Sequence, residues 1–435
     1  MLIEFKVANY RSIRAEQTLS MVASNYSDEL PQNLISCDHV PGLKGTKLVK
    51  AVALYGANAS GKSNIVAALR FFAEFVRDSA TKLQPGAPTG AQPFKLDPKC
   101  LTEPSKFEIT AVINGIRTLY GIELTRERVT SEYLVAYPKG RPQVWFERDW
   151  DEAKGKYAWS KSTEHFKHDA ALREKTRENA AFVSVAAQFN QEQCLLVWKF
   201  LSEGALALDL IAHPPDWTRS LEMLRDPAAQ KKIVEALKIA DLGIQDARIR
   251  KAERMSFFEI KIAPPTVRSP EPDPMAVAMK KHMDRLYPPD RPELLHRTID
   301  GGVAPLDFET EESSGTQRYF NLLGEWLRLE EPCRLLVADE IETSLHPTLL
   351  NSLIKALFET PKSRTQFLFT THNPLLLDQT LLRRDQIWFT EKDQEGATRL
   401  YPLTDFKPRK DESLVKGYLA GRYGGIPFIP EGLKF

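Results

Sequence analysis

The stretch GANASGKS, residues 56–63, follows an apolar run at 48–56 and precedes a segment with helical spacing of apolar residues at 62–80. It matches the pattern G-x-x-x-x-G-K-[ST], which binds phosphate when a strand precedes it and a helix follows. Gly56 and Gly61 permit backbone angles that turn successive N–H groups towards phosphate oxygens. A chance glycine-rich turn is the alternative, and the complete pattern in this context argues against it. The sequence therefore predicts a phosphate-binding loop.

The residues that would act on the phosphates lie in this loop and in a later apolar run. Lys62 is expected to reach the β- and γ-phosphates of ATP, and the Ser63 hydroxyl to bind Mg²⁺. RLLVADE (334–340) is an apolar run that ends in two acids. Asp339 is predicted to bind Mg²⁺ opposite Ser63, and Glu340 to polarise the attacking water. Acids at a strand end are common, so this interpretation depends on the phosphate loop in the same chain.

A histidine follows the next apolar run. FLFTTHN (367–373) places His372 just beyond a strand, at the carboxyl edge of the expected sheet. A histidine there can contact the γ-phosphate and hold the water in line. A lone histidine after a strand is often incidental, but its order and spacing after Glu340 favour the catalytic interpretation.

ESSGTQR (312–318) predicts a second anion site at the start of a helix. A serine N-cap followed by glycine leaves N–H groups and a hydroxyl at a positive helix end. We predict that Ser314 and Gly315 contact a γ-phosphate held by another subunit, so that two chains face head to tail and enclose two ATP molecules. An ordinary helix cap is the alternative, and the position of the segment shortly before Asp339 favours the anion site.

Length, composition and net charge limit the class of protein to which the chain can belong. The chain has 435 residues, which suggests two or three subdomains, with 42% apolar and 27% charged residues and a net charge of +1. This charge indicates neither a nucleic acid nor a membrane partner, although local patches remain open. No signal peptide or bilayer-length apolar run is evident. The cysteines form no CxxC pair, which fits a reducing, cytoplasmic location; they are Cys37, Cys100, Cys194 and Cys333.

Hydrophobic periodicity predicts the order of elements. Strands are expected at 2–8, 16–23, 48–56, 181–189, 247–263, 335–338 and 366–370, with one more strand after the last helix and an antiparallel sheet over 106–148. Helices are expected at 62–80, 171–180, through most of 192–240, at 275–286, from 312, at 348–359 and again after 370, with a proline-rich loop at 264–274. The two α/β ends flank a different middle. We therefore predict a nucleotide-binding domain with an insertion: 1–190 as its N-terminal half, 191–305 as the insertion and 306–435 as its C-terminal half with a short tail.

The set GANASGKSN, ESSGTQR, LLVADE, ETSLHP and TTHN resembles, in this order, the ABC-type ATPases of the group that contains SMC, Rad and RecF proteins and the overcoming-lysogenization-defect nucleases. There the five segments are the Walker A, signature, Walker B, D-loop and switch-histidine motifs. The resemblance implies an α/β fold, namely an ABC-type P-loop ATPase domain with a mixed sheet, an antiparallel β-lobe and a mainly helical insertion. It also implies ATP and Mg²⁺ as ligands.

The resemblance also implies site residues. FKVANYRSI resembles the group's first strand, with Asn9, Arg11 and Ser12 near the nucleotide, and FVSVAAQFN resembles its glutamine loop, which makes Gln188 a candidate Mg²⁺ and water contact. The implied catalytic residues are Glu340 and His372, and the implied metal ligands are Ser63, Asp339 and Gln188. The implied nucleotide contacts are Gly56, Asn58, Ser60, Gly61, Lys62, Ser63, Asn64, Arg11, Ser314, Gly315 and Gln317.

The tail narrows the resemblance. RRDQIWFTEKD and KDESLVKGYLAGRYGGIPFI are similar to the stand-alone ATPases of bacterial phage-defence and abortive-infection operons (the Rlo/AbiL type and relatives of the PARIS ATPase). Nuclease relatives carry a C-terminal Toprim domain, whereas residues 373–435 contain no D-x-D. We therefore expect an ATP-hydrolysing switch, a homodimer or higher oligomer, that senses or scaffolds and controls a separate nuclease- or Toprim-like effector from the same operon. Departures from the LSGGQ signature and in the D-loop leave the turnover rate open.

Two other functions remain. A DNA-repair ATPase of the RecF/SMC type would clamp DNA directly, and the basic runs RIRKAER (248–254) and MKKHMDR (279–285) could contact phosphates. Solvated faces are the alternative for both runs, and the near-zero net charge favours it. An ATPase whose turnover serves only assembly is the third function.

Overall fold

The computed structural model describes residues 1–25, 30–160, 166, 170–208, 217–240, 243–251, 290–331, 334–361, 363–410 and 412–426. Contacts divide the chain into two compact units: unit 1 (Met1–Leu208, Leu329–Glu342 and Leu350–Phe435) and unit 2 (Asp209–Arg328 and Thr343–Leu349). The expected loop at 264–274, the helix at 275–286 and the whole basic run at 279–285 lie outside the described residues, as do residues 252–263 of the expected strand at 247–263. The three-part division of the chain stays a prediction.

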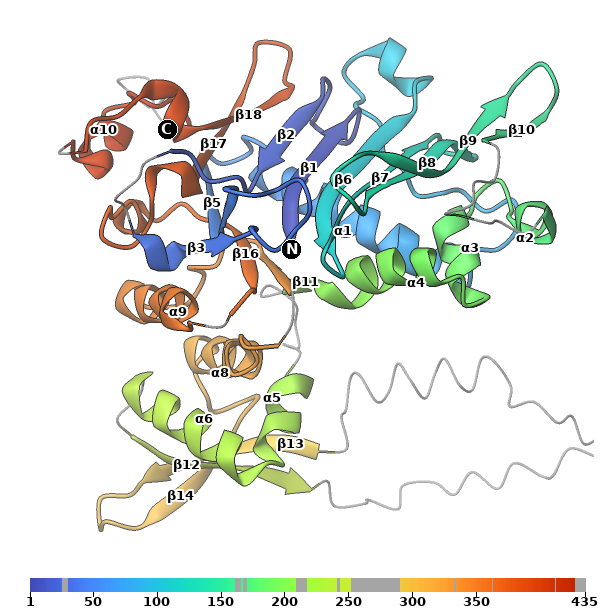
Figure 1. The fold of residues 1–435 in the computed structure, drawn as a ribbon. Coiled ribbons are helices and arrows are strands. Elements are labelled where there is room, and N and C mark those ends of the chain that lie inside the picture. Colours follow the sequence, from blue (N-terminus) through green and yellow to red (C-terminus); the bar gives the residue numbers. More distant parts are fainter. Residues whose placement is uncertain are drawn as a thin grey trace, which may run out of the picture. The chain divides into compact units, whose positions relative to one another are not determined.

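One sheet of unit 1 is antiparallel and has seven strands (Figure 1). Its strands are, in spatial order, β10 (Lys156–Trp159), β9 (Gln143–Asp151), β8 (Val129–Tyr137), β7 (Ile116–Leu124), β6 (Ser105–Ile113), β1 (Leu2–Ala8) and β2 (Gln17–Ser20). Buried and more exposed residues alternate along β6 and β8. The period-two pattern at 106–148 therefore predicted this sheet correctly.

The other large sheet of unit 1 is mostly parallel. Its order is β11 (Ala205–Leu208), β15 (Leu335–Ala338), β16 (Gln366–Thr370), β5 (Ala51–Gly56), β17 (Ile387–Lys392) and β18 (Thr398–Pro402), and only β18 runs antiparallel to its neighbour. β5, β15 and β16 are buried along their whole length, which explains their continuous apolar runs. Their carboxyl ends share one edge. A separate pair joins β3 (Leu34–Ser36) to β4 (Lys47–Val49).

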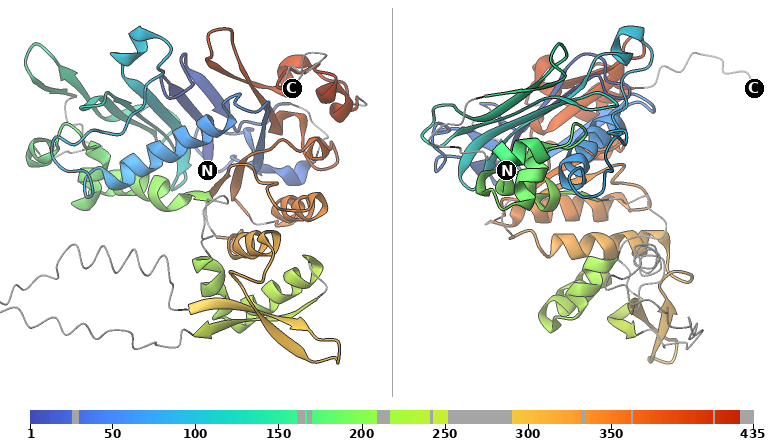
Figure 2. Two further views of the ribbon diagram at one scale, coloured as in Figure 1. Left: turned by 180° about the vertical axis from the view of Figure 1, so that it is seen from behind. Right: turned by 90° about the vertical axis from the view of Figure 1, so that its right-hand side faces the viewer.

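The helices of unit 1 are α1 (Lys62–Asp78), α2 (Ala170–Lys175), α3 (Phe182–Gln188), α4 (Glu192–Lys199) with a π-turn at Phe200–Gly204, α9 (Pro347–Glu359, whose first three residues belong to unit 2) and α10 (Leu414–Leu419). Short 3₁₀ turns cover Pro31–Asn33, Pro98–Leu101, Pro374–Leu376, Arg384–Gln386 and Leu403–Phe406. α1 lies along the antiparallel sheet (Figure 2), where Phe72 stacks on Phe107 and Tyr120. The same core cluster includes Leu54 of the parallel sheet, so α1 joins the two sheets.

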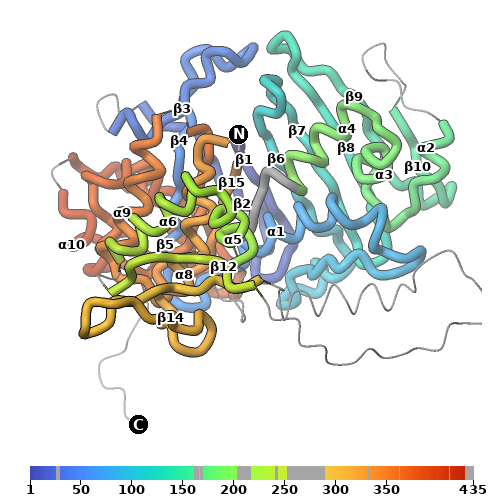
Figure 3. Tube along the Cα trace, turned by 90° about the horizontal axis from the view of Figure 1, so that it is seen from below, coloured from blue at the N-terminus to red at the C-terminus, as the bar shows by residue number. Residues whose placement is uncertain are grey.

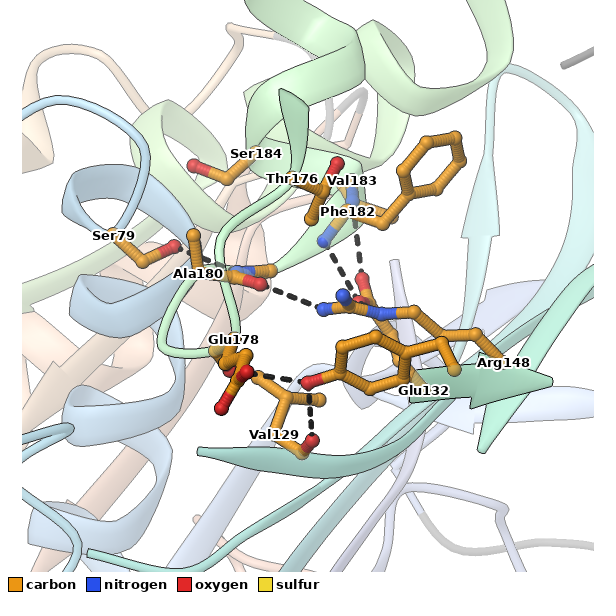
Figure 4. Close-up of polar contacts among 12 residues, drawn as sticks. Ser79, Val129, Glu132, Arg148, Thr176, Glu178, Ala180, Phe182, Val183 and Ser184 are labelled. Atoms are coloured by element: carbon orange, nitrogen blue, oxygen red, sulfur yellow. Dashed lines mark hydrogen bonds and ion pairs between the residues drawn. The ribbon is translucent and has the colours of Figure 1, made fainter. Parts of the chain in front are cut away.

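The structure corrects the strand predicted at 181–189, which is helix α3 and lies beside α4 and α1 (Figure 3). The Glu132 carboxylate on β8 accepts the N–H groups of Phe182 and Val183, the first two helical residues, at 2.7 and 3.0 Å. These groups lack partners inside any helix, so Glu132 caps α3. Arg148 donates to Glu132 from Nε and Nη2 at 2.8 and 2.6 Å, and both side chains are fully buried (Figure 4). A cap supplied by a distant strand leaves no local sequence signal.

Other elements also differ from prediction. The helix expected after 370 is replaced by 3₁₀ turns, and the helix expected at 171–180 ends at Lys175. The pattern did not reveal β3, β10, β11, β13, β14 or β18. Among the described residues, no helix combines the length and apolar character that crossing a bilayer requires.

Unit 2 pairs helices with a small antiparallel sheet. Its elements are α5 (Thr218–Leu224), α6 (Pro227–Ala240), β12 (Ile244–Lys251), β13 (Asp290–Arg297), β14 (Val303–Asp307) and α8 (Ser314–Trp326), with β13 the central strand. α6 packs on β12 and on α8. α5 lies close to α8: the Ser220 hydroxyl donates to Phe320 O at 2.6 Å. A Cβ at Gly324 would lie 2.5 Å from that hydroxyl, so glycine at this position permits the close approach.

Candidate nucleotide site

The loop between β5 and α1 requires glycine at two positions. A Cβ at Gly56 would lie 2.5 Å from both the Ser60 and the Thr390 hydroxyl oxygens. Gly61 has φ +109°, and a Cβ there would lie 2.0 Å from Thr398 Oγ1. Larger residues would therefore displace the loop from the strands that support it.

Hydroxyl and amide groups fix the loop from three parts of unit 1. Asn64 Nδ2 donates to Ser12 Oγ at 2.6 Å, and Ser12 Oγ lies 2.8 Å from Thr398 Oγ1. Thr398 Oγ1 donates to Ser60 O at 3.0 Å, and Ser60 Oγ bonds Thr390 Oγ1 at 2.6 Å. Ser60 and Asn64 thus hold the loop in shape. Thr390 and Thr398 escaped the sequence analysis because they lie more than 300 residues from it.

Lys62 is the buried cation of the site. Its Nζ donates to Gly56 O at 2.8 Å and to Ala57 O at 3.1 Å. Burial lowers the pKa of Lys62 to about 8, although the carboxylates of Asp339, Glu340 and Glu342 oppose the change. The ammonium therefore lies within the field of the acids that follow β15.

Two hydrogen-bonded links join the ends of β15 and β16. Thr370 Oγ1 donates to Asp339 Oδ1 at 2.6 Å and accepts the Glu340 N–H at 2.7 Å. Glu342 accepts the His372 N–H at 2.5 Å. Glu340 has φ +47°, a left-handed conformation that costs a non-glycine residue free energy and concentrates at functional sites. Thr370 and Glu342 are the first residues of the TTHN and ETSLHP segments, but the sequence analysis assigned neither of them a role.

These elements enclose a cavity of about 380 Å³, a size suited to a small ligand. It is lined by Asn58, Ala59, Gly61, Lys62, Ser63, Asn64, Glu340 and His372. The structure thus brings together the phosphate loop, the predicted base and the predicted switch histidine. Burial, with a smaller effect of Lys62, lowers the pKa of His372, so a neutral imidazole is favoured.

The donors near the cavity fit Mg²⁺. The Ser63 side chain is exposed to the cavity, and Asp339 offers carboxylate oxygens close to Lys62. Mg²⁺ prefers such oxygen donors, and in nucleotide sites it takes one or two protein ligands beside the phosphates. In the described part of the chain, no group of three His, Cys, Asp or Glu side chains forms a metal site by itself. The residues present therefore suit a metal that arrives with a nucleotide.

Five predicted residues of unit 1 do not line this cavity: Gly56, Ser60, Asp339, Arg11 and Gln188. The Arg11 N–H donates to Gln92 O at 2.7 Å, and its guanidinium lies 5.5 Å from the Tyr10 ring. Gln188 is exposed at the end of α3. The start of α3 bonds to Ser79 at the C-terminal end of α1, whereas Lys62 begins α1. Gln188 lies at the other end of α3 and is not among the residues that line the cavity.

The signature segment lies in unit 2 and begins α8. Ser313 is the N-cap and accepts the Thr316 N–H at 3.1 Å, and Ser314, the first helical residue, is exposed. A Cβ at Gly315 would lie 2.6 Å from Ser344 O, so glycine lets the D-loop backbone approach the helix. Arg318 donates to Thr343 O at 2.9 Å. The signature helix and the D-loop are thereby held together within unit 2.

Gln317 is used inside unit 2. Its Nε2 donates to Phe308 O at 2.8 Å and, at longer range, to Glu309 O and Glu312 O. Its amide therefore holds the loop that precedes α8.

Residues 51–378 match the model of a protein family described as "AAA domain, putative AbiEii toxin, Type IV TA system". Among solved structures, an SMC head bound to the C-terminal winged-helix domain of ScpA is 12% identical, with a TM-score of 0.42, over 96% of this chain and 99% of that one. The SMC head of Thermotoga maritima is 12% identical, with a TM-score of 0.38, over 92% and 98%. An SMC head derived from Pyrococcus furiosus, with an extended coiled coil, is 11% identical, with a TM-score of 0.36, over 97% and 98%. No curated protein matches the chain.

Proposed function

The chain belongs to this family of AAA domains and is therefore an ATP-binding P-loop ATPase. We propose that it hydrolyses ATP with Mg²⁺ in the cavity at residues 56–64. We also propose that it acts as a switch in phage defence. The observation that carries the proposal is this cavity, where Lys62, Glu340 and His372 meet. The switch would control a separate effector protein.

Lys62 binds the phosphates in this mechanism. Its ammonium donates to the carbonyl oxygens of Gly56 and Ala57. Phosphate oxygens are stronger acceptors for an ammonium, and the N-terminus of α1 adds its positive end. The Ser63 hydroxyl and the Asp339 carboxylate would hold Mg²⁺, which when bound neutralises charge on the β- and γ-phosphates.

Glu340 is the base. Its carboxylate accepts the proton of the attacking water, and its left-handed backbone, held by Thr370, fixes where that carboxylate lies. His372, across the cavity, contacts the γ-phosphate and holds the water in line. The lowered pKa of His372 supports a neutral ring that can both donate to phosphate and accept from water.

A second copy of the chain would complete the site. Ser314 and Gly315 are free to meet an anion because Ser313 already caps α8 and leaves the Ser314 side chain exposed at the positive end of the helix. We assign them to the γ-phosphate held by a partner chain, in a homodimer with two shared ATP sites. Closure and opening of these sites would then report ATP hydrolysis to the effector.

The defence role takes its support from the family description, which names a toxin of a toxin–antitoxin system. DNA clamping has less support. Arg248, the first basic residue of RIRKAER, pairs with Glu293 at 2.5 Å and is not available to a phosphate in this state. We therefore keep the switch as the proposed function.

Glu340→Gln tests this function. The amide keeps the size of the side chain but cannot take a proton, so kcat should fall by ~10²–10⁴ while ATP still binds. Steady-state phosphate release and a direct ATP titration measure the two effects, with the exposed Glu359→Gln on α9 as the matched control. Wild-type turnover in Glu340→Gln would remove Glu340 as the base.

A further inference from the structure

Glu342 reaches from the turn after β15 to the turn after β16. Its Oε1 accepts the backbone N–H of His372 at 2.5 Å. Because β15 and β16 are parallel neighbours, this bond ties the turn that bears the acids to the turn that bears the histidine. A side chain two residues beyond Glu340 thus fixes the backbone at His372, another residue that lines the nucleotide cavity.

The residues on either side of His372 are held by other groups. The Thr371 N–H donates to Leu54 O at 3.0 Å, and the Asn373 N–H donates to the Thr371 hydroxyl at 3.0 Å. The Tyr55 hydroxyl donates to Asn373 O at 3.3 Å. Removing the Glu342 carboxylate would therefore release the backbone at His372 in particular, while its neighbours keep their own partners.

The second oxygen of Glu342 takes no part in this link. Oε2 is buried and has no hydrogen-bond partner among the described residues. The contact of Oε1 with the His372 N–H therefore holds this backbone, and an amide at the same position would keep that acceptor.

The charge of Glu342 acts on the same histidine. Burial and the nearby Lys62 ammonium both lower the pKa of His372. Glu342 is the largest of the opposing effects, and Glu340 and Asp339 act in the same direction. Glu342 therefore offsets part of the decrease in the pKa of His372 that burial and Lys62 cause.

We propose that Glu342 is a positioning residue for ATP hydrolysis, which holds the His372 backbone so that the imidazole stays in the wall of the nucleotide cavity. The assignment rests on the proposed function, and it names a residue that acts through His372. Glu342 itself does not line the cavity, so nucleotide affinity should not depend on it.

Two substitutions separate holding the backbone from merely filling space. Glu342→Ala removes the acceptor, and we expect kcat to fall by ~10–100-fold, the usual effect of losing a group that orients a reacting residue. ATP affinity should stay within about threefold of wild type, because the phosphate loop is unchanged. Glu342→Gln keeps an oxygen that accepts the His372 N–H, so it should retain more turnover than the alanine variant. Glu359→Ala on α9 is the control for loss of a glutamate.

Amide hydrogen exchange at His372 gives a readout independent of turnover. We expect the His372 amide to exchange faster in Glu342→Ala and to stay protected in Glu342→Gln. Wild-type turnover in Glu342→Ala would overturn the assignment. So would a Glu342→Gln variant that matches Glu342→Ala both in kcat and in the exchange rate of the His372 amide. If turnover did not depend on Glu340, the proposed function would fall, and the catalytic part of this assignment would fall with it. The exchange result would still show whether Glu342 holds the His372 backbone.

Discussion

Unit 1 holds carboxylates in two very different surroundings. Glu132, within the antiparallel half, is fully buried, and each of its oxygens accepts at least two hydrogen bonds from groups of the chain, Arg148 among them. At the end of β15, by contrast, Glu340 has a left-handed backbone and Glu342 Oε2 lacks a donor among the described residues. The polar groups of the first cluster are satisfied within the fold, whereas the second lies at the nucleotide cavity that Glu340 lines.

The cluster around Glu132 stabilises the fold, whereas the surroundings of Lys62 cost the fold free energy. Around Glu132, desolvation is offset by several hydrogen bonds and an ion pair. Around Lys62, burial lowers the pKa to about 8, so the charged form is disfavoured relative to an exposed lysine. Because the folded-state pKa lies below the unfolded value, the charge on Lys62 destabilises the fold at neutral pH. A bound phosphate would offset that cost.

The largest expected effect is on the completed cluster. Glu132→Ala leaves Arg148 buried without its counterion and removes the cap of α3, so the free energy of unfolding should fall by about 3–5 kcal/mol. Chemical denaturation measures this loss, and the exposed Glu359→Ala should change the same quantity by less than about 0.5 kcal/mol. If Glu132→Ala were as stable as wild type, the contrast between the two clusters would not hold.

Lys62→Ala should weaken ATP binding without lowering the free energy of unfolding. ATP affinity should weaken by about 1.5–3 kcal/mol, or ~10–150-fold, because a charge-assisted hydrogen bond to phosphate is lost. Stability should stay the same or rise, since a buried ammonium has been removed. Calorimetric ATP titration and denaturation of the same preparation check both statements. Unchanged affinity would contradict the assignment of residues 56–63 to phosphate.

Much of the fold could be predicted from the sequence, because continuous apolar runs and period-two alternation report burial directly. β15 and β16 begin and end where the apolar runs at 335–338 and 366–370 do. α3 was predicted as a strand because its apolar residues are all buried and show no polar face, and its cap is a glutamate from β8. Tertiary contacts of this kind override a local pattern.

The candidate site divides in the same way. Lys62, Ser63, Glu340 and His372 belong to short patterns with a mechanism, and the structure places them around one cavity. The groups that act through other residues were not predicted. The Thr370 hydroxyl and the Glu342 carboxylate lie within quoted motifs, but their hydrogen-bond partners are more than 25 residues away in the chain and leave no local signal. Gln188, which rested on a resemblance alone, is not among the residues that line the cavity.

The central claim is that ATP is hydrolysed in a site completed by a second chain, and a mixing experiment tests it most directly. Ser314→Arg should block the shared site from the signature side while ATP still binds at residues 56–63, and Lys62→Ala should block it from the phosphate side. Neither variant alone should turn over. With random exchange of chains, half of the dimers carry one site free of both lesions, so the mixture should regain up to about a quarter of wild-type turnover. Full activity of Ser314→Arg alone, or no recovery in a mixture that demonstrably forms mixed dimers, would contradict the account.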